Sequence, residues 1–152
     1  MNAEVEPVFI DTNILIYAHD RSAGFKYEVA KNLIDELWQS EQGCLSLQVL
    51  QEFFVNVTQK LSKPIERKTA REIISNLAEW RIHLPQFDDL LQAINLQEVH
   101  SLSFWDAMVI NSAIQLGCSV LISEDLAHDQ VYTGVRVINP FLENGDKFGK
   151  EN

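Results

Sequence analysis

The sequence has little of what marks a secreted or membrane protein. Its two cysteines, Cys44 and Cys118, are too few for a disulfide framework, and neither lies in a Cys-x-x-Cys pair. No apolar run approaches the roughly 18 residues that a membrane span needs. The opening MNAEVEPVF lacks the basic and apolar regions of a secretory signal. We therefore expect a soluble protein with free thiols in a reducing cytoplasm.

Positive charge is also scarce. Lys and Arg number 12 against 22 Asp and Glu, which gives a net charge of −10, whereas phosphate binding normally requires a basic surface. Several of the basic residues nevertheless fall in one short stretch: Lys60, Lys63, Arg67, Lys68 and Arg71. Such a run is usually a solvated helix face. The alternative is a patch that contacts the phosphates of RNA.

The pattern of apolar residues predicts short strands that alternate with helices. Strands are expected at residues 8–10, 44–47, 119–123 and 135–139, and helices at 12–20, 24–42, 47–61, 66–81, within 85–100, and at 103–117. This alternation indicates the α/β class, with a parallel sheet covered by helices. The length suits one domain, which we place at residues 1–141, followed by a polar tail at 142–152.

Four acidic residues are predicted to meet at one edge of that sheet. Asp11 follows the first strand and Asp125 follows the strand SVLIS. Glu52 and Asp106 lie in the early turns of two helices. In parallel sheets the carboxyl ends of the strands share an edge at which ligands bind. Singly, each acid has a structural explanation, as a helix cap, a turn former, a surface residue or part of a capping box that starts at Ser103.

Two patterns favour a joint role for these acids. Asp106 shares a helical stripe with Ile110 and Ala113, and Glu52 lies in a helix that is apolar nearly all round, so both are predicted to face packed structure. Carboxylates about 5 Å apart repel by about 3 kcal/mol per pair at an effective dielectric near 20. No Lys or Arg adjoins any of the four. A divalent cation that takes oxygen ligands, Mg²⁺ or Mn²⁺, is therefore the simplest partner.

Several segments, taken in order, resemble the PIN-domain ribonucleases, and in particular the VapC-like toxins of type II toxin–antitoxin pairs. The segments are FIDTNILIYA, the helix of Glu52, LSFWDAMVINSA, LISEDL and VRVINPF, which together extend from Val8 to Phe141. The resemblance implies a three-layer α/β/α sandwich around a mainly parallel sheet of about five strands. It also implies an endoribonuclease that depends on Mg²⁺ or Mn²⁺.

The resemblance assigns roles to individual residues. By match to the family motifs, the catalytic quartet would be Asp11, Glu52, Asp106 and Asp125, supported by Thr12, Asn13 and Ser123. All the aspartates of the quartet would hold the metal. Glu52 would orient a water molecule, complete a second metal site or act as general base. The fourth acid stays open, because Glu124 adjoins Asp125 and Asp129 lies one turn further on.

Other functions compete with the nuclease hypothesis. One is a non-catalytic module that binds a protein partner. Another is a phosphoryl-handling domain, either a receiver or a haloacid-dehalogenase-like phosphatase, although the latter needs a second Asp where Asn13 stands. No Ser/His pairing can be assigned, so a covalent nucleophile is not expected. If the resemblance holds, the partners are an RNA substrate and a cognate antitoxin, a homodimer is compatible with the family, and no membrane is involved.

Overall fold

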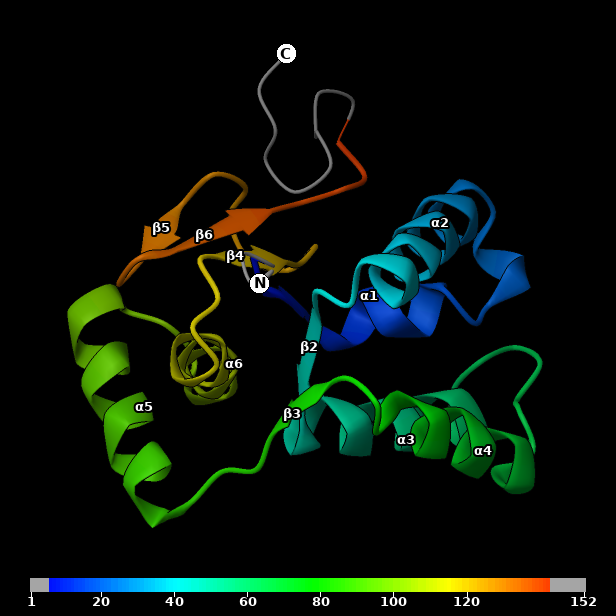
Figure 1. Cartoon of the computed structure of the whole chain (residues 1–152), viewed down its shortest axis with the longest axis horizontal. Helices are drawn as coiled ribbons and strands as arrows, with labels where there is room; N and C mark the ends of the chain where they lie inside the picture. The colour runs from blue at the N-terminus through cyan, green and yellow to red at the C-terminus, as the bar shows by residue number, and fades with distance from the viewer. Residues whose placement is uncertain (1–5, 143–152) are drawn as a thin grey trace.

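A computed structural model describes residues 6–142, so the predicted tail lies, apart from Leu142, outside the described residues (Figure 1). The strands are β1 (Val8–Ile10), β2 (Gly43–Ser46), β3 (Arg81–His83), β4 (Val120–Ile122), β5 (Val131–Tyr132) and β6 (Val135–Ile138). The helices are α1 (Thr12–Tyr17), α2 (Phe25–Ser40), α3 (Leu47–Gln59), α4 (Arg67–Leu77), α5 (Phe87–His100) and α6 (Phe104–Gln115), with a 3₁₀ turn at Arg21–Ala23. The predicted α/β class is confirmed.

The strands form one sheet in the order β3-β2-β1-β4-β6-β5. All pairs are parallel except β5 and β6, which form an antiparallel hairpin. Thr133 and Gly134 connect them with φ values of 50° and 85°, as a two-residue hairpin turn that follows the strand twist requires. The sheet is thus mainly parallel, as expected, with six strands in place of about five.

The sequence pattern did not predict the two edge strands. β3 is only three residues long, and Arg81 in it is exposed, so it lacks the continuous apolar run that marks a central strand. β5 has two residues. The predicted helix at 66–81 was too long because it included the start of β3. Helix α4 ends at Leu77, and β3 begins at Arg81.

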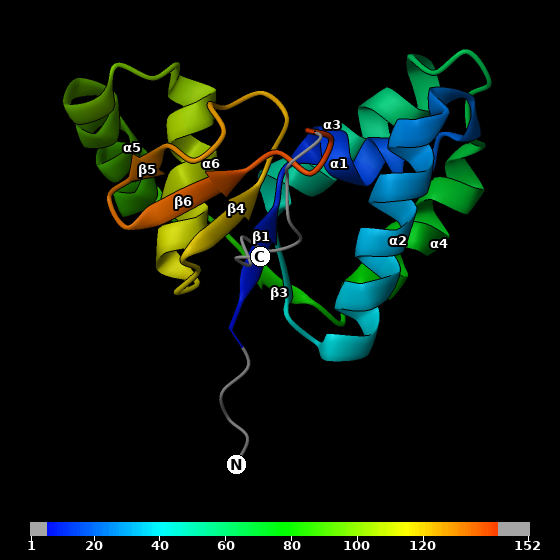
Figure 2. The same cartoon turned by 90° about the horizontal axis from the view of Figure 1, so that it is seen from above.

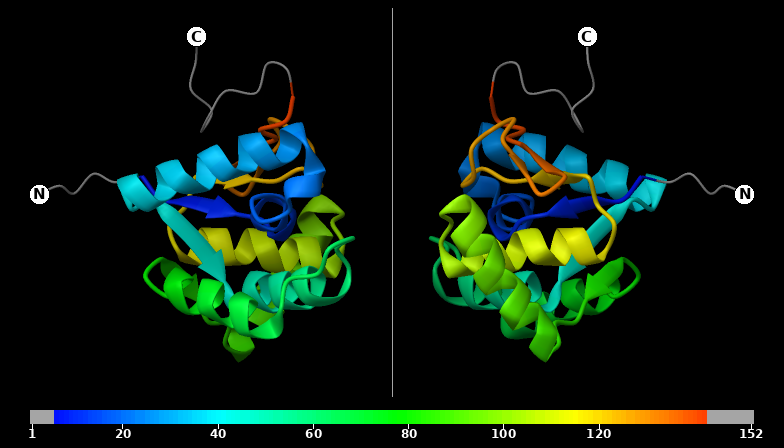
Figure 3. Two further views of the ribbon diagram at one scale, coloured as in Figure 1. Left: turned by 90° about the vertical axis from the view of Figure 1, so that its right-hand side faces the viewer. Right: turned by 90° about the vertical axis from the view of Figure 1, so that its left-hand side faces the viewer.

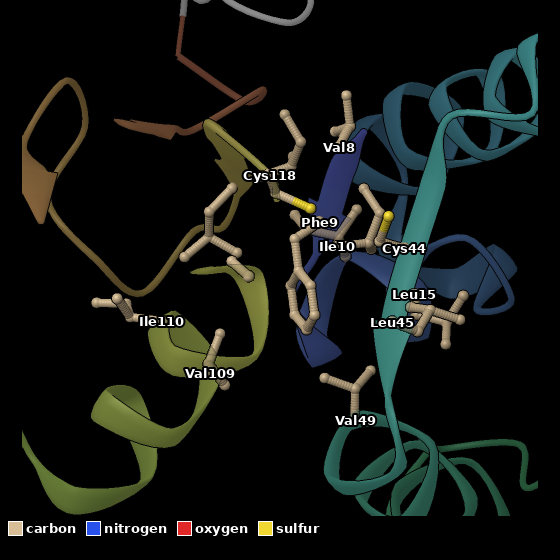
Figure 4. Close-up of a cluster of buried hydrophobic side chains, with 14 of the residues drawn as sticks. Val8, Phe9, Ile10, Leu15, Cys44, Leu45, Val49, Val109, Ile110 and Cys118 are labelled. Carbon is tan, nitrogen blue, oxygen red and sulfur yellow. The ribbon is translucent and has the colours of Figure 1, made fainter. Parts of the chain in front are cut away.

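Helices cover both faces of the sheet. Figures 1 and 2 show α5 and α6 on one side and α1, α2, α3 and α4 on the other, so the predicted three-layer sandwich is confirmed. Side chains of the central strands fill the space between the layers, and Figure 4 shows Phe9 and Ile10 packed among residues of β2 and α6. Phe9 is fully buried; burying a side chain of this kind contributes about 1.5–3 kcal/mol.

Both cysteines are free and buried, as expected. No helix within residues 6–142 combines the length and the apolar composition needed to cross a membrane.

The topology fixes where functional side chains can gather. β1, β2 and β4 run in parallel, so their carboxyl ends lie at one edge of the sheet, where Asp11 and Ser123 follow the strands directly. Figure 3 shows β1 crossing the molecule with α1 at its tip. Helices α1 and α3 begin at this edge, with Asp11 and Ser46 as their N-caps.

Candidate functional site

Asp11 is the most enclosed of the four acids, with 6% of its surface exposed. It ends β1 and caps α1, and both carboxylate oxygens are hydrogen-bonded. Oδ1 accepts from the backbone amide of Thr12 at 2.7 Å, and Oδ2 accepts from the hydroxyl of Ser123 at 2.7 Å. Ser123 follows β4 and is fully buried. Contacts from the ends of the neighbouring strands β1 and β4 thus orient the Asp11 carboxylate.

Glu52 is joined to the same edge through α1. The hydroxyl of Thr12 donates to Oε1 of Glu52 at 2.7 Å, and Nε2 of Gln48 donates to Oε2 at 3.3 Å. Thr12 therefore contacts Asp11 with its backbone and Glu52 with its side chain. These contacts link Asp11 to Glu52 through Thr12, which lies 40 residues before Glu52 in the chain.

Asp106 and Asp125 are more open. Asp106 is partly exposed in the first turn of α6, where its amide donates to the hydroxyl of the N-cap Ser103 at 3.1 Å. Asp125 is exposed beyond β4, and its amide donates to the hydroxyl of Ser123 at 3.2 Å. The cap that Ser103 was predicted to supply is thus present, and the hydroxyl of Ser123 contacts both Asp11 and the amide of Asp125.

The charges of the four acids are coupled. Burial raises the pKa of Asp11 to about 6, hydrogen bonds from Ser123 and Thr12 oppose that rise, and the charges of Asp125 and Asp106 add to it. The pKa of Asp125 is also raised, by burial and then by Asp106, Glu124 and Glu52, while a hydrogen bond from Asn13 opposes the rise. Ionisation of Asp11 and of Asp125 is therefore disfavoured, in each case by burial first and then by the charges of neighbouring acids.

The chemistry of this edge fits a hard divalent cation. Its side chains offer carboxylate oxygens, and Oδ1 of Asn13 is buried without a hydrogen-bond partner among the described residues. A cation would offset both the burial and the mutual repulsion that raise the pKa of Asp11 and of Asp125. Within residues 6–142, however, no three Asp, Glu, His or Cys side chains lie close enough together to hold one ion.

The neighbours of Asp125 are engaged elsewhere. Glu124 accepts a hydrogen bond from the hydroxyl of Tyr17 at 2.7 Å and forms an ion pair with Lys26. Asp129 accepts from the guanidinium of Arg136 at 2.8 Å and 3.0 Å. Both carboxylates are therefore already paired, whereas Asp125 forms no ion pair within residues 6–142.

The basic stretch begins at the C-terminal end of α3, the helix that carries Glu52. All its members are exposed: Lys60, Lys63, Arg67, Lys68 and Arg71. None of them takes part in an ion pair within the described part of the chain. Arg67, Lys68 and Arg71 line a pocket of about 350 Å³ whose floor includes Phe54. Lys60 is eight residues beyond Glu52 at the end of α3, or about 12 Å along the axis.

A Ser–His–Asp line does exist, contrary to the expectation that none could be assigned. Nδ1 of His83 lies 2.7 Å from the hydroxyl of Ser112, and Nε2 lies 3.4 Å from a carboxylate oxygen of Asp89. Asp89 also accepts from Nδ2 of Asn111 at 2.8 Å. Ser112 is fully buried in α6, so no substrate reaches its hydroxyl. The cluster joins β3, α5 and α6, and its role is structural.

The contacts of Lys26 and Tyr17 with Glu124 had not been expected from the sequence. Their separations of 98 and 107 residues explain this, because no local pattern pairs residues so far apart. The one available signal was the doubled acid at Glu124 and Asp125, which implies that one of the two carries a partner.

Comparison with known proteins places this arrangement in a family. Residues 8–134 match the PIN domain, and no significant match appears among curated protein sequences. A toxin–antitoxin complex from Klebsiella pneumoniae superposes with a TM-score of 0.63 at 21% identity, covering 88% of this chain and 98% of that one. The FitAB complex bound to an IR36 DNA fragment gives 0.66 at 17% identity, over 88% and 94%.

A third structure is VapC20 of Mycobacterium tuberculosis, a toxin that cleaves the sarcin–ricin loop. It gives a TM-score of 0.58 at 18% identity, and covers 75% of this chain and 86% of that one. At these identities the structural matches establish the fold. The sequence match covers most of the chain and all four of the acids described above. The chain belongs to the PIN domain family.

Proposed function

We propose that the protein is a metal-dependent endoribonuclease that hydrolyses RNA phosphodiester bonds at the edge formed by Asp11, Glu52, Asp106 and Asp125. The observation that carries the proposal is the electrostatic coupling of these acids, which come from four separate segments. A cluster of like charge destabilises a fold unless a group of opposite charge, such as a bound cation, offsets the repulsion. A scaffold that only binds another protein has no such use for it.

Each supporting residue would have a defined task. Asp11, Asp106 and Asp125 would hold Mg²⁺ or Mn²⁺, which when bound supplies charge neutralisation at the phosphate and acidifies water. Ser123 and the Thr12 amide fix the orientation of the Asp11 carboxylate.

Glu52 is held by Thr12 Oγ1 at 2.7 Å. From there it would accept a proton from the attacking water, as a general base does. Hydrolysis of this kind leaves a 5′-phosphate and a 3′-hydroxyl.

The basic stretch would supply the attraction that the rest of this acidic protein lacks. Its five cations are exposed, and α3 leads from Glu52 directly to Lys60. Phosphates on one side of the scissile bond would follow this surface, while the acids act on the bond itself. A net charge of −10 makes such a local patch necessary for RNA to approach.

We further propose that the protein is the toxin of a toxin–antitoxin pair and binds a cognate antitoxin. Support comes from the structural relatives, which include a toxin–antitoxin complex and the FitAB complex. The surplus of negative charge suits a partner whose contact segment is basic. The remaining candidate function is a non-catalytic interaction module of the same fold.

Asp106→Asn tests the nuclease proposal, because the Asp106 carboxylate is partly exposed and the helix cap uses only its backbone amide. Asp88→Asn is the matched control, since Asp88 is an exposed acid in the first turn of α5. Purified proteins would be incubated with structured and unstructured RNA in Mg²⁺, Mn²⁺ or EDTA.

We expect metal-dependent cuts that leave 5′-phosphates for the wild type and for Asp88→Asn, with a loss of at least about 100-fold in Asp106→Asn. Equal cleavage by Asp106→Asn, or cleavage that persists in EDTA, would contradict the metal-dependent mechanism. Absence of both cleavage and metal binding in all three proteins would favour the interaction module.

A further inference from the structure

Three aromatic rings and a lysine form a continuous surface next to the acidic edge. We call Tyr17, Phe25, Lys26 and Phe141 the aromatic shelf. The ring of Phe141 contacts Tyr17 edge-on, with centroids 5.3 Å apart, and Phe25 with centroids 6.2 Å apart. Nζ of Lys26 lies 5.2 Å from the centroid of Tyr17 and 5.4 Å from that of Phe141. The shelf thus unites the end of α1, the start of α2 and the segment after β6.

The shelf presents apolar ring surface to solvent. Phe25 is 60% exposed, although it belongs to a cluster in which the other rings are half-buried. A single exposed hydrophobic residue needs no explanation. Here the exposed ring stands on two further rings and beside an ammonium group. Such a surface can stack a flat, electron-rich group.

The shelf is connected to the acidic edge through Glu124. Tyr17 donates to one oxygen of Glu124, and Lys26 pairs with the other. Glu124 precedes Asp125 in the chain and raises the pKa of Asp125. Lys26 therefore neutralises a carboxylate that would otherwise add to the negative charge on the path of an incoming phosphate. Tyr17 and Lys26 thus both contact the residue that directly precedes Asp125 in the chain.

We propose that the aromatic shelf stacks an unpaired base of the RNA substrate, one or two nucleotides from the phosphate that the acids cleave. This inference rests on the proposed nuclease function and extends it to the choice of substrate. Bases can reach a protein ring only where they are unstacked and unpaired. The shelf thereby selects single-stranded segments and loops over duplex RNA. An unpaired base is favoured over a protein segment because the shelf adjoins the acids through Tyr17 and Glu124.

The test compares three substitutions. Phe25→Ala removes the ring, and Phe25→Trp keeps a stacking surface. Phe87→Ala is the matched control, because Phe87 is also a highly exposed phenylalanine at the first position of its helix, at 76% exposure. Both positions are exposed, so we expect folding to be preserved. Cleavage of a single-stranded RNA would be measured as kcat and KM. Photocross-linking to RNA that carries 5-iodouridine, followed by mass spectrometry, would identify the rings that touch a base.

Loss of one base–aromatic stack weakens binding by between about 5-fold and about 150-fold. We expect Phe25→Ala to raise KM within that range while kcat stays within about 2-fold, and Phe25→Trp and Phe87→Ala to resemble the wild type. Cross-links should fall on Phe25, Phe141 or Tyr17. If the wild type cleaves RNA but Phe25→Ala has an unchanged KM and the shelf carries no cross-link, the shelf proposal is wrong and the nuclease stands.

Two further outcomes separate the proposals. If the wild type cleaves no RNA, the nuclease proposal fails, and cross-linking alone decides whether a base stacks on the shelf. If Phe25→Ala leaves RNA cleavage intact and weakens only the binding of a co-expressed protein partner, the shelf is a protein-binding surface and the proposal is overturned.

Discussion

Asp11 should destabilise the metal-free fold, and Asp11→Asn should therefore stabilise it. The pKa of Asp11 is raised from 3.8 to about 6, mainly by burial, and a tenfold change in a protonation equilibrium corresponds to about 1.4 kcal/mol. The ionised carboxylate then costs the fold about 3 kcal/mol at pH 8. Part of this gain is offset in the variant, because weakening the hydrogen bonds from Thr12 and Ser123 costs about 1 kcal/mol.

The sign of the pH dependence follows from the raised pKa. A carboxyl group whose pKa is higher in the folded state stabilises the fold below its unfolded pKa, and that stabilisation is lost as the pH rises through about 6. The advantage of Asp11→Asn should therefore grow by about 2 kcal/mol between pH 4.5 and pH 8. At pH 8 the net gain of about 2 kcal/mol corresponds to a Tm higher by roughly 4–8 °C.

Urea unfolding of both proteins in EDTA, at several pH values, measures this difference, with Asp88→Asn as a control whose difference from the wild type should stay flat. Saturating Mn²⁺ should reverse the order, because it stabilises only the protein that retains the carboxylate. If Asp11→Asn is no more stable than the wild type at pH 8, or if the gap does not widen with pH, then Asp11 carries no uncompensated charge and the argument for a metal partner is refuted.

Three further sets of substitutions test the packing of β2, the proposed metal site and the basic stretch. Gly43→Ala should lower the free energy of unfolding by about 1–3 kcal/mol, measured by urea unfolding, because an added Cβ would meet the ring of Trp80 at 2.4 Å. Asp125→Asn should abolish the rise in Tm that Mn²⁺ gives the wild type, by removing one proposed ligand; an unchanged rise would exclude that role. Charge reversal at Lys68 and Arg71 should weaken RNA binding and reduce its dependence on salt by about one phosphate contact per residue, as titration at several salt concentrations would show.

Local patterns in the sequence were enough to predict the α/β class and most of the helices and strands. The apolar run Val8–Ile10 predicted the central strand β1 because a strand buried on both faces must be apolar throughout. Periodic apolar stripes predicted the helices in the same way. The two edge strands escaped prediction, since a strand at the margin needs no such run and β3 carries an exposed Arg81.

The sequence also predicted that four acids share an edge, because parallel topology alone brings strand ends together, and their joint role stays a prediction. It could not predict how their pKa values are shifted. The raised pKa of Asp11 depends on burial and on charges from two distant segments, and these are properties of the packed protein.

Only the tertiary structure showed which of two adjacent acids is already paired. Glu124 and Asp125 are equivalent in sequence terms, and the difference between them is that Glu124 meets Lys26 and Tyr17. Those partners arrive from α1 and α2, about a hundred residues earlier in the chain. Such pairings depend on how layers of helix and sheet stack in space, which no short-range pattern of residues encodes. The aromatic shelf is likewise a product of this stacking, because its residues come from α1, α2 and the segment after β6.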